Sequence, residues 1–222
     1  MSEQKYIVGI DVGGTFTDLL CLNTESQELL SEKVPSIPGS QWKGVLGALE
    51  QLGIDYSEIR AFVHGTTIAT NALLERKGAK TGLVTTEGFR DTLEIGRTRR
   101  LIGGLFDIKF VRPKPLVSRD LRVEVDERVA ADGELLQSVD EVDFAPIVEK
   151  FRESGVKAIA IAFMNAYRNS ANEETALAKL QALAGDIPVC ASTGVVPEKG
   201  EFERFSTCVL NAYLTPVVTT YL

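Results

Sequence analysis

A pair of glycines between two short apolar runs places the tightest limit on how this chain begins to fold. Residues 5–12 are rich in β-branched side chains and stop at Gly13-Gly14, and residues 16–23 are apolar again. Because glycine adopts turn conformations at little steric cost, the pattern predicts two strands joined by a tight turn. A third strand is expected over residues 28–34, before Pro35 removes a ladder donor.

Beyond this start, strand and helix patterns alternate, which predicts an α/β layer fold with parallel strands. Residues 96–115 interrupt the rhythm and are expected to form a long loop, and residues 121–136 are expected to form a hairpin that turns at Asp132-Gly133. The apolar spacing predicts helices over 42–52, 69–77, 88–95, 142–154, 173–183 and from 201 onward, and strands over 59–64, 81–85, 158–163 and 189–192.

Composition excludes several classes of protein. The chain of 222 residues has 31 acidic and 24 basic side chains, a net charge of −7, which argues against a nucleic-acid partner. No apolar run approaches the roughly 18 residues of a membrane span, so no membrane association is expected. Cys21, Cys190 and Cys208 lie far apart in apolar segments without a CxxC pair, which indicates buried, reduced thiols in a cytoplasmic protein.

The segment from Asp11 to Asp18 has the residue types of a phosphate site. Gly13 and Gly14 let backbone N–H groups approach an anion, and Thr15 and Thr17, two apart on a strand, are expected to offer both hydroxyls on one side. Asp11 at the strand end suits Mg²⁺ held through water. A plain hairpin with a glycine turn explains the same residues equally well. The glycine spacing is neither that of a Walker loop nor that of the dinucleotide fingerprint.

A second candidate motif runs from His64 to Asn71, where a buried strand is expected to end and a helix to begin. A helix start presents unpaired N–H groups, so Gly65, Thr66 and Thr67 are candidates to hold a phosphate or a polarised carbonyl. The alternative is an N-cap threonine and a structural histidine. His64 is the only histidine, which excludes a multi-histidine metal site in this chain.

Charged clusters elsewhere are less specific. Arg97, Arg99 and Arg100 are suited to clamp a phosphate or carboxylate, although a solvated basic loop explains them as well. The acidic residues from Glu124 to Asp143, Glu127 among them, are interpreted as a solvated hairpin face and helix start. The last helix stays apolar up to the final residue without a polar tail, so we expect the N-terminal part of a longer chain.

Taken together, these segments resemble the hydantoinase/oxoprolinase family, namely the N-terminal region of its large hydantoinase A-type subunit. The resemblance extends over nearly the whole chain. It rests on five segments in family order: VGIDVGGTFTD at 8–18, HGTTIATNALLERKGAKTGLVTTEGFRD at 64–91, IGR at 95–97, DER with DGE at 126–134, and GEFERFSTCVLNAYLTPVV at 200–218.

For the fold, the resemblance implies one ribonuclease H-like half of an actin-like ATPase that opens with three antiparallel strands. A single domain over 1–222 would then carry an inserted β-hairpin segment around 97–138. In such a fold Asp11 lies near Mg²⁺, and Gly13, Gly14, Thr15 and Thr17 lie near the phosphates of ATP.

For activity, the resemblance implies ATP-dependent opening of cyclic amides such as 5-oxoproline, hydantoins or lactams, with a hydantoinase B-type partner subunit in an oligomer. Phosphorylation of the amide oxygen makes it a leaving group, so water can attack the carbon. His64 is then the candidate proton carrier, and Gly65, Thr66, Thr67, Asn71 and Arg97 are candidate contacts to substrate or phosphate.

Two alternatives remain open at this point. A neighbouring branch of the family carboxylates ketones with the same ATP half, and the glycine hairpin also occurs in sugar kinases and in actin-like or chaperone ATPases without small-molecule chemistry. An actin-like site needs a second half with its own phosphate loop, so this segment alone is expected to be inactive.

Overall fold

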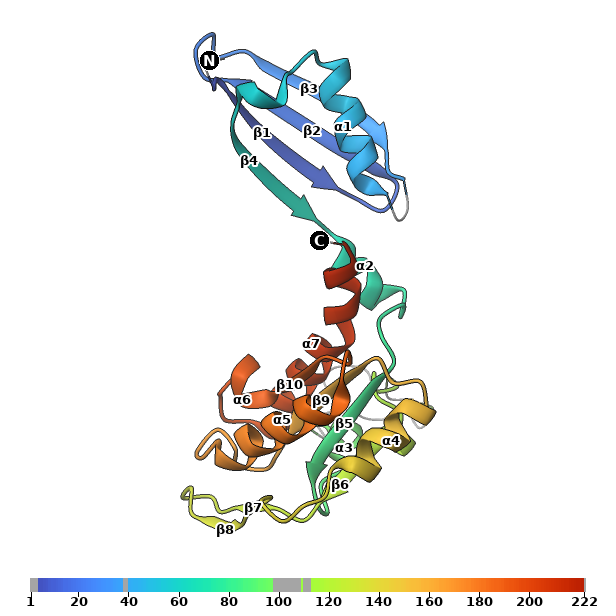
Figure 1. Cartoon of the computed structure of the whole chain (residues 1–222), viewed down its shortest axis with the longest axis vertical. Coiled ribbons are helices and arrows are strands. Elements are labelled where there is room, and N and C mark those ends of the chain that lie inside the picture. Colours follow the sequence, from blue (N-terminus) through green and yellow to red (C-terminus); the bar gives the residue numbers. More distant parts are fainter. Residues whose placement is uncertain (1–3, 38–39, 98–108, 110–112, 222) are drawn as a thin grey trace. The chain divides into compact units, whose positions relative to one another are not determined.

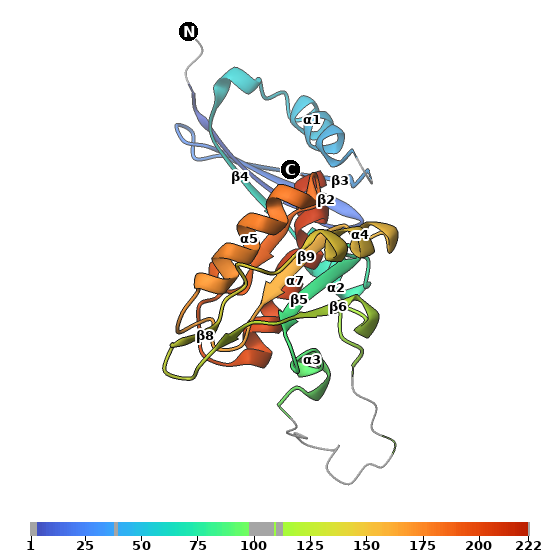
Figure 2. The same cartoon turned by 60° about the horizontal axis from the view of Figure 1, so that its bottom comes forward.

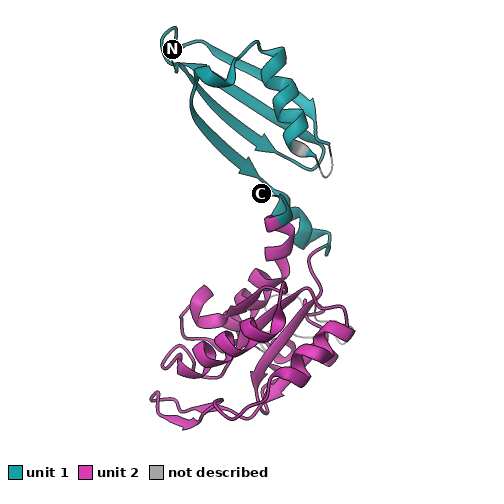
Figure 3. Ribbon diagram, in the orientation of Figure 1, with its two compact units in different colours: residues 1–77, 220–222 teal, residues 78–219 magenta. Residues whose placement is uncertain are grey.

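The computed structural model describes residues 4–37, 40–97, 109 and 113–221. The chain divides into two compact units (Figure 3): unit 1 is Met1–Lys77 with Thr220–Leu222, and unit 2 is Gly78–Thr219. The single domain over 1–222 and the insert around 97–138 stay predictions, because most of residues 98–112 lie outside the described residues.

Unit 1 is built on a four-stranded sheet in the order β3-β2-β1-β4 (Figure 1). β1 (Tyr6–Val12), β2 (Phe16–Asn23) and β3 (Leu29–Pro35) form an antiparallel meander, which confirms the three expected strands. β4 (Ile59–Thr66) runs parallel to β1.

The hydrophobic core of unit 1 lies on one face of this sheet. Alternate residues of β1 and β2 are buried, and helix α1 (Gln41–Gln51) packs against β2 and β3 over that face. This alternation is the pattern of strands covered on a single side. The buried side chains of this core include Val8, Ile10, Leu19, Cys21, Ala48 and Leu49.

The prediction that the strand before His64 is buried is wrong. Every residue of β4 after Ile59 is exposed, because β4 is the edge strand and α1 lies over β2 and β3. A 3-10 turn, Tyr56–Glu58, precedes β4, and helix α2 (Ile68–Leu74) follows it after one residue.

Unit 2 contains the predicted parallel sheet, in the order β10-β9-β5-β6 (Figures 1 and 2). Its strands are β5 (Thr81–Thr86), β6 (Arg122–Val125), β9 (Ala158–Ala162) and β10 (Val189–Ala191), all parallel to their neighbours. Every residue of β5 and β9 is buried, as expected for central parallel strands covered on both faces.

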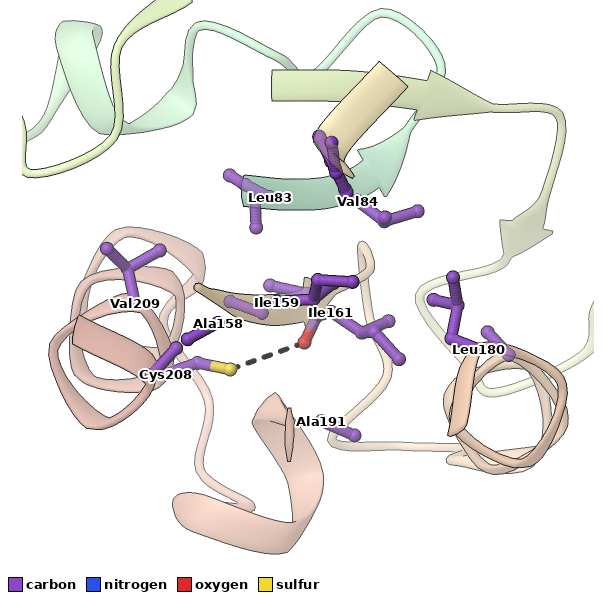
Figure 4. Close-up of a cluster of buried hydrophobic side chains, with 14 of the residues drawn as sticks. Leu83, Val84, Ala158, Ile159, Ile161, Leu180, Ala191, Cys208 and Val209 are labelled. Carbon is purple, nitrogen blue, oxygen red and sulfur yellow. Dashed lines mark hydrogen bonds between the residues drawn. The ribbon is translucent and has the colours of Figure 1, made fainter. Parts of the chain in front are cut away.

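Helices on both sides bury this sheet. Figure 4 shows Leu83, Val84, Ile159 and Ile161 between Leu180 of α5 on one face and Val209 of α7 on the other. The helices of unit 2 are α3 (Thr92–Ile95), α4 (Ala145–Glu153), α5 (Ala171–Ala184), α6 (Ser192–Val195) and α7 (Glu201–Tyr221), whose last residues count with unit 1. Among the described residues, no helix is both long enough and apolar enough to cross a membrane.

Residues 121–136 were predicted to form one hairpin, but the structure divides them between two sheets. Its first half, β6, follows a 3-10 turn (Arg119–Leu121) and joins the parallel sheet next to β5. Only β7 (Arg128–Val129) and β8 (Leu135–Gln137) form the expected antiparallel hairpin around Asp132-Gly133. Alternation of side chains along a strand does not reveal which strand will be its partner.

Candidate functional site

A backbone hydrogen bond closes the glycine turn between β1 and β2. The N–H of Gly13 donates to the carbonyl oxygen of Phe16 at 3.0 Å, and a Cβ on Gly13 would lie 3.0 Å from that same oxygen. A larger residue would therefore open the turn. The N–H groups of Gly14 and Thr15 take no part in the bonds that close it.

Ser36, just after β3, holds the turn from outside. Its hydroxyl donates to the carbonyl of Gly13 at 2.8 Å, and its N–H donates to the carbonyl of Thr15 at 2.9 Å. The hydroxyl of Thr17 lies 3.0 Å from the Ser36 oxygen and donates to it, since the Ser36 proton is already engaged. No sequence signal pointed to Ser36, which follows a proline in an expected loop.

These bonds correct the expected placement of the two threonines. Thr15 precedes β2 and is exposed, whereas Thr17 lies inside β2 with 0% of its surface exposed. Side chains alternate along a strand, and Thr17 shares the α1 face with Leu19. The two hydroxyls therefore do not lie on one open side.

The second motif meets the glycine turn at one end of the unit 1 sheet. The Thr66 hydroxyl and the Thr67 N–H both approach the Val12 carbonyl, at 3.3 and 3.4 Å. The Asn71 amide donates to the Thr67 hydroxyl at 3.3 Å, and a Cβ on Gly14 would lie 3.4 Å from that amide nitrogen. Two segments that are more than fifty residues apart thus form one cluster.

Asp11 lies at the end of β1 on the face of the sheet opposite α1. Its cross-strand partner is Asp18, which is ion-paired with Lys33 at 2.9 Å, and its neighbour on β4 is Gly65. The Asp11 side chain is exposed. No group of three or more metal-ligating side chains forms within the described residues. A cation at Asp11 would therefore take most of its ligands from water and from a bound substrate.

His64 lies on the other face from Asp11. It pairs in register with Ile10, whose side chain is buried beneath α1, so the imidazole shares that side of the sheet. Its Nε2 atom lies 2.6 Å from the hydroxyl of Tyr221, and the two rings meet edge to face at 5.6 Å. Tyr221 is 157 residues away in the chain, and sequence analysis had no means of finding it.

The arginine cluster is described only in part. Arg97 belongs to unit 2, where its guanidinium forms an ion pair with Glu203 of α7 and holds the pKa of that carboxyl below its ordinary value. Arg99 and Arg100 lie outside the described residues. Contact of Arg97 with a phosphate stays a prediction.

The interpretation of the acidic segment as solvated fails for Glu127, which is only 1% exposed. Its carboxylate accepts hydrogen bonds from the Thr86 hydroxyl and, at 2.8 Å, from the Asn172 amide. Burial raises the pKa of Glu127 above its usual value, and these two bonds oppose the shift. Glu127 therefore anchors the segment after β6 to the ends of β5 and α5.

Several known proteins are similar to this chain in sequence and in fold. The alpha subunit of caprolactamase from Pseudomonas jessenii is 37% identical over 230 residues, covering 100% of this chain and 33% of that protein. The crystal structure of that ATP-dependent caprolactamase matches 97% of this chain and 32% of its own with a TM-score of 0.84 at 36% identity.

Two carboxylases are also similar. The gamma subunit of acetophenone carboxylase from Aromatoleum aromaticum is 32% identical over 226 residues, covering 93% of this chain and 31% of that protein. A nucleotide-free acetone carboxylase matches 96% of this chain and 32% of its own with a TM-score of 0.83 at 24% identity, a likeness of fold.

The chain thus spans about a third of the length of these relatives. Their folds confirm the expected α/β architecture of an actin-like ATPase half. The sequence profile described as the hydantoinase/oxoprolinase N-terminal region matches residues 7–183. This chain belongs to the hydantoinase/oxoprolinase family and represents the N-terminal region of its A-type subunit.

Proposed function

We propose that the glycine turn of unit 1 binds the phosphates of ATP, with Mg²⁺ held at Asp11 through water. The observation that carries the proposal is the approach of the Asn71 amide to Gly14, which unites the two candidate motifs at one end of the sheet. Because Gly13 has no Cβ, the turn can stay tight. The exposed Asp11 carboxylate suits a hydrated hard cation.

Each residue of the cluster takes a distinct part in this proposal. The N–H groups of Gly14 and Thr15 and the exposed Thr15 hydroxyl contact phosphate oxygens. Thr17 acts indirectly, because its hydroxyl holds Ser36 against the turn. Thr66 and Thr67 fasten the start of α2 to β1, and Asn71 orients Thr67 beside the turn.

The proposed reaction is the ATP-dependent opening of a cyclic amide, supported by 37% identity to the caprolactamase alpha subunit. ATP supplies the phosphoryl group that turns the amide oxygen into a leaving group, so that water can attack the ring carbon. His64 faces away from Asp11, so its proposed proton transfer concerns the organic substrate and not the phosphates.

A carboxylase activity toward ketones is the second candidate. It is favoured by the 32% identity to the acetophenone carboxylase gamma subunit, which covers 93% of this chain. Both named relatives are subunits, which supports a partner subunit of the hydantoinase B type and an oligomeric assembly. The ATP cluster would serve either reaction, because only the acceptor of the phosphoryl group differs.

The test is phosphate release from ATP and Mg²⁺ by the complete protein with its partner subunit. Substrates to compare are 5-oxoproline, hydantoin, caprolactam, and a ketone with bicarbonate. Asp11→Asn is expected to abolish the stimulated rate. Glu28→Gln is the control, because it removes the same charge from an exposed carboxylate in the β2–β3 connection and not in the glycine turn. This variant should leave the stimulated rate unchanged.

Each outcome decides between the candidates. Stimulation by a cyclic amide supports the hydrolase, and stimulation only by a ketone with bicarbonate supports the carboxylase in its place. ATP binding that persists without stimulation by either class would contradict both and favour a non-catalytic ATPase. Full activity of Asp11→Asn would show that Asp11 has no part in the proposed ATP site.

A further inference from the structure

Two cysteines that are 18 residues apart in the sequence touch each other in unit 2. Cys190 lies in the edge strand β10 and Cys208 in helix α7, and their sulfur atoms are 3.8 Å apart. Each sulfur also approaches the backbone carbonyl of the other residue, at 3.7 and 3.8 Å. No local pattern in the sequence predicted this contact, and the structure has all three cysteines of the chain free.

The two thiols differ in accessibility. Cys208 is 0% exposed and its thiol also lies 3.4 Å from the Ile161 carbonyl, the contact drawn in Figure 4. Cys190 is only half-buried. Of the two residues, only Cys190 therefore keeps part of its surface open to a small oxidant from solvent.

The contact also makes Cys190 the more acidic thiol. The hydrogen bond from Cys208 lowers the pKa of Cys190 to about 7, against the opposing effect of burial. The same hydrogen bond, together with burial, raises the pKa of Cys208 well above its ordinary value. At neutral pH a thiolate, the nucleophilic form, is therefore favoured on Cys190 over Cys208.

We propose that Cys190 and Cys208 form a reversible redox site, in which peroxide oxidises Cys190 and Cys208 then closes a disulfide between β10 and α7. The Cys190 thiolate attacks one peroxide oxygen, the O–O bond breaks, and hydroxide leaves. The hydroxide takes up the proton that the Cys190 thiol released on ionising, so the products are a sulfenic acid and water. The Cys208 sulfur then attacks the Cys190 sulfur, and the sulfenic oxygen leaves with the Cys208 proton as a second water. Two thiols lose two electrons, and one peroxide gains them.

The two sulfur atoms already lie in contact before this bond forms. The sulfurs must approach from 3.8 Å to about 2.05 Å, and the Cys208 thiol gives up its contact with the Ile161 carbonyl. The closed loop contains Ser192 and Arg204, which are already joined by a 3.0 Å hydrogen bond between the Ser192 hydroxyl and the guanidinium. The disulfide would thus reinforce an existing link between the end of the sheet and α7.

The first experiment treats the reduced protein with a small excess of hydrogen peroxide at pH 7 and blocks the remaining thiols with an alkylating agent. We expect the intact mass, measured before alkylation, to fall by two hydrogen atoms, and peptide mapping after alkylation to show one Cys190–Cys208 link that dithiothreitol reverses. Thermal unfolding of the oxidised protein is expected to shift upward by about 5–10 °C.

Three serine variants assign the roles. Cys208→Ser should retain a sulfenic acid at Cys190 that dimedone traps, and Cys190→Ser should leave Cys208 reduced. Cys21→Ser is the matched control: Cys21 is 0% exposed in unit 1, and burial raises the pKa of its thiol, so this variant should oxidise like the parent.

If a variant fails to fold, the parent protein alone still tests the redox proposal. A peptide map that shows no Cys190–Cys208 link after peroxide treatment overturns the proposal. So does conversion of Cys190 to sulfinic acid in place of the disulfide, or a link between two copies of the chain. Oxidation of Cys190→Ser at the parent rate would show that Cys190 is not the first thiol to react.

Discussion

The buried carboxyl group of Glu127 links the stability of unit 2 to pH. Its hydrogen-bond donors are the Thr86 hydroxyl and the Asn172 amide, neither of which carries a charge. Burial therefore dominates and raises the pKa of Glu127 in the folded state. A carboxyl of this kind stabilises the fold fully below its unfolded pKa, and that contribution is lost as pH rises through the folded pKa.

Glu127→Gln should remove this pH dependence. Between pH 4 and 7 the free energy of unfolding of the parent protein should fall relative to the variant, by about 1.4 kcal/mol for each unit of pKa shift. Urea unfolding at pH 4, 5.5 and 7 measures the difference. Glu134→Gln, at an exposed carboxyl in the β7–β8 turn, is the control and should follow the parent. Parallel pH profiles for Glu127→Gln and the parent would contradict the argument.

His64 and Asp11 should have separable effects on the proposed reaction, because they lie on opposite faces of the unit 1 sheet. We expect His64→Gln to lower kcat by about 10²–10⁴-fold and to leave the Kd for ATP unchanged. Tyr221→Phe removes only the hydroxyl 2.6 Å from Nε2, so a smaller loss in kcat is expected. Phosphate-release kinetics and calorimetric ATP binding test both variants. A higher Kd for ATP in His64→Gln would contradict this separation, because it would mean that the imidazole contacts the nucleotide.

At the scale of the elements, β5 and α4 pack closely against each other, a contact that no pattern in the sequence suggested. A Cβ on Gly82 of β5 would lie 2.7 Å from the ring of Phe151, which is 0% exposed in α4. Neither the strand nor the helix can move away without opening the core around them.

Gly82→Ala should therefore destabilise the protein by about 1–3 kcal/mol through overpacking. Gly47→Ala in α1 is the matched control, because nothing lies within 4 Å of its added Cβ. Alanine favours a helix over glycine, so this second variant should gain up to about 1 kcal/mol. Urea unfolding distinguishes the two. Equal stability of Gly82→Ala and the parent would mean that the Phe151 ring yields more easily than its burial implies.

Strong local patterns were sufficient to predict most of these elements, and partners distant in the chain were not predictable. The β-branched run that stops at Gly13-Gly14 predicted β1, and the apolar run over 158–163 predicted the strand β9. The exposure of β4 was missed, because hydropathy does not show that a strand lies at an edge. The same limit explains β6, whose pairing with β5 depends on packing across unit 2.

In the candidate site too, local features were predictable from the sequence and contacts between distant segments were not. The glycine turn and the start of α2 were predicted because glycine and threonine clusters act on their own neighbours in sequence. Thr17 was misplaced because the sequence does not show that α1 covers its face of β2. Ser36, Tyr221 and the Cys190–Cys208 contact depend on tertiary structure alone, and no local pattern marks them.

At the scale of the whole molecule, the two units have separate hydrophobic cores. Within the part of the chain that the structure describes, no buried side chain belongs to both clusters. The core of unit 2 lies around a sheet with helices on both faces, whereas α1 covers one face of the unit 1 sheet. Large side chains on the sheet of unit 1 stay more than half exposed, such as Leu20 at 51%, Leu29 at 62% and Val63 at 62%.

Two thermal transitions are therefore expected, with unit 1 unfolding first because it buries less apolar surface. Leu49→Ala in unit 1 and Leu180→Ala in unit 2 remove side chains that are 2% and 0% exposed, and each should cost about 2–5 kcal/mol. In scanning calorimetry, Leu49→Ala should lower only the first transition and Leu180→Ala only the second. If both variants moved one common transition, the two cores would unfold as a single cooperative unit, and the separation of the clusters would have no thermodynamic counterpart.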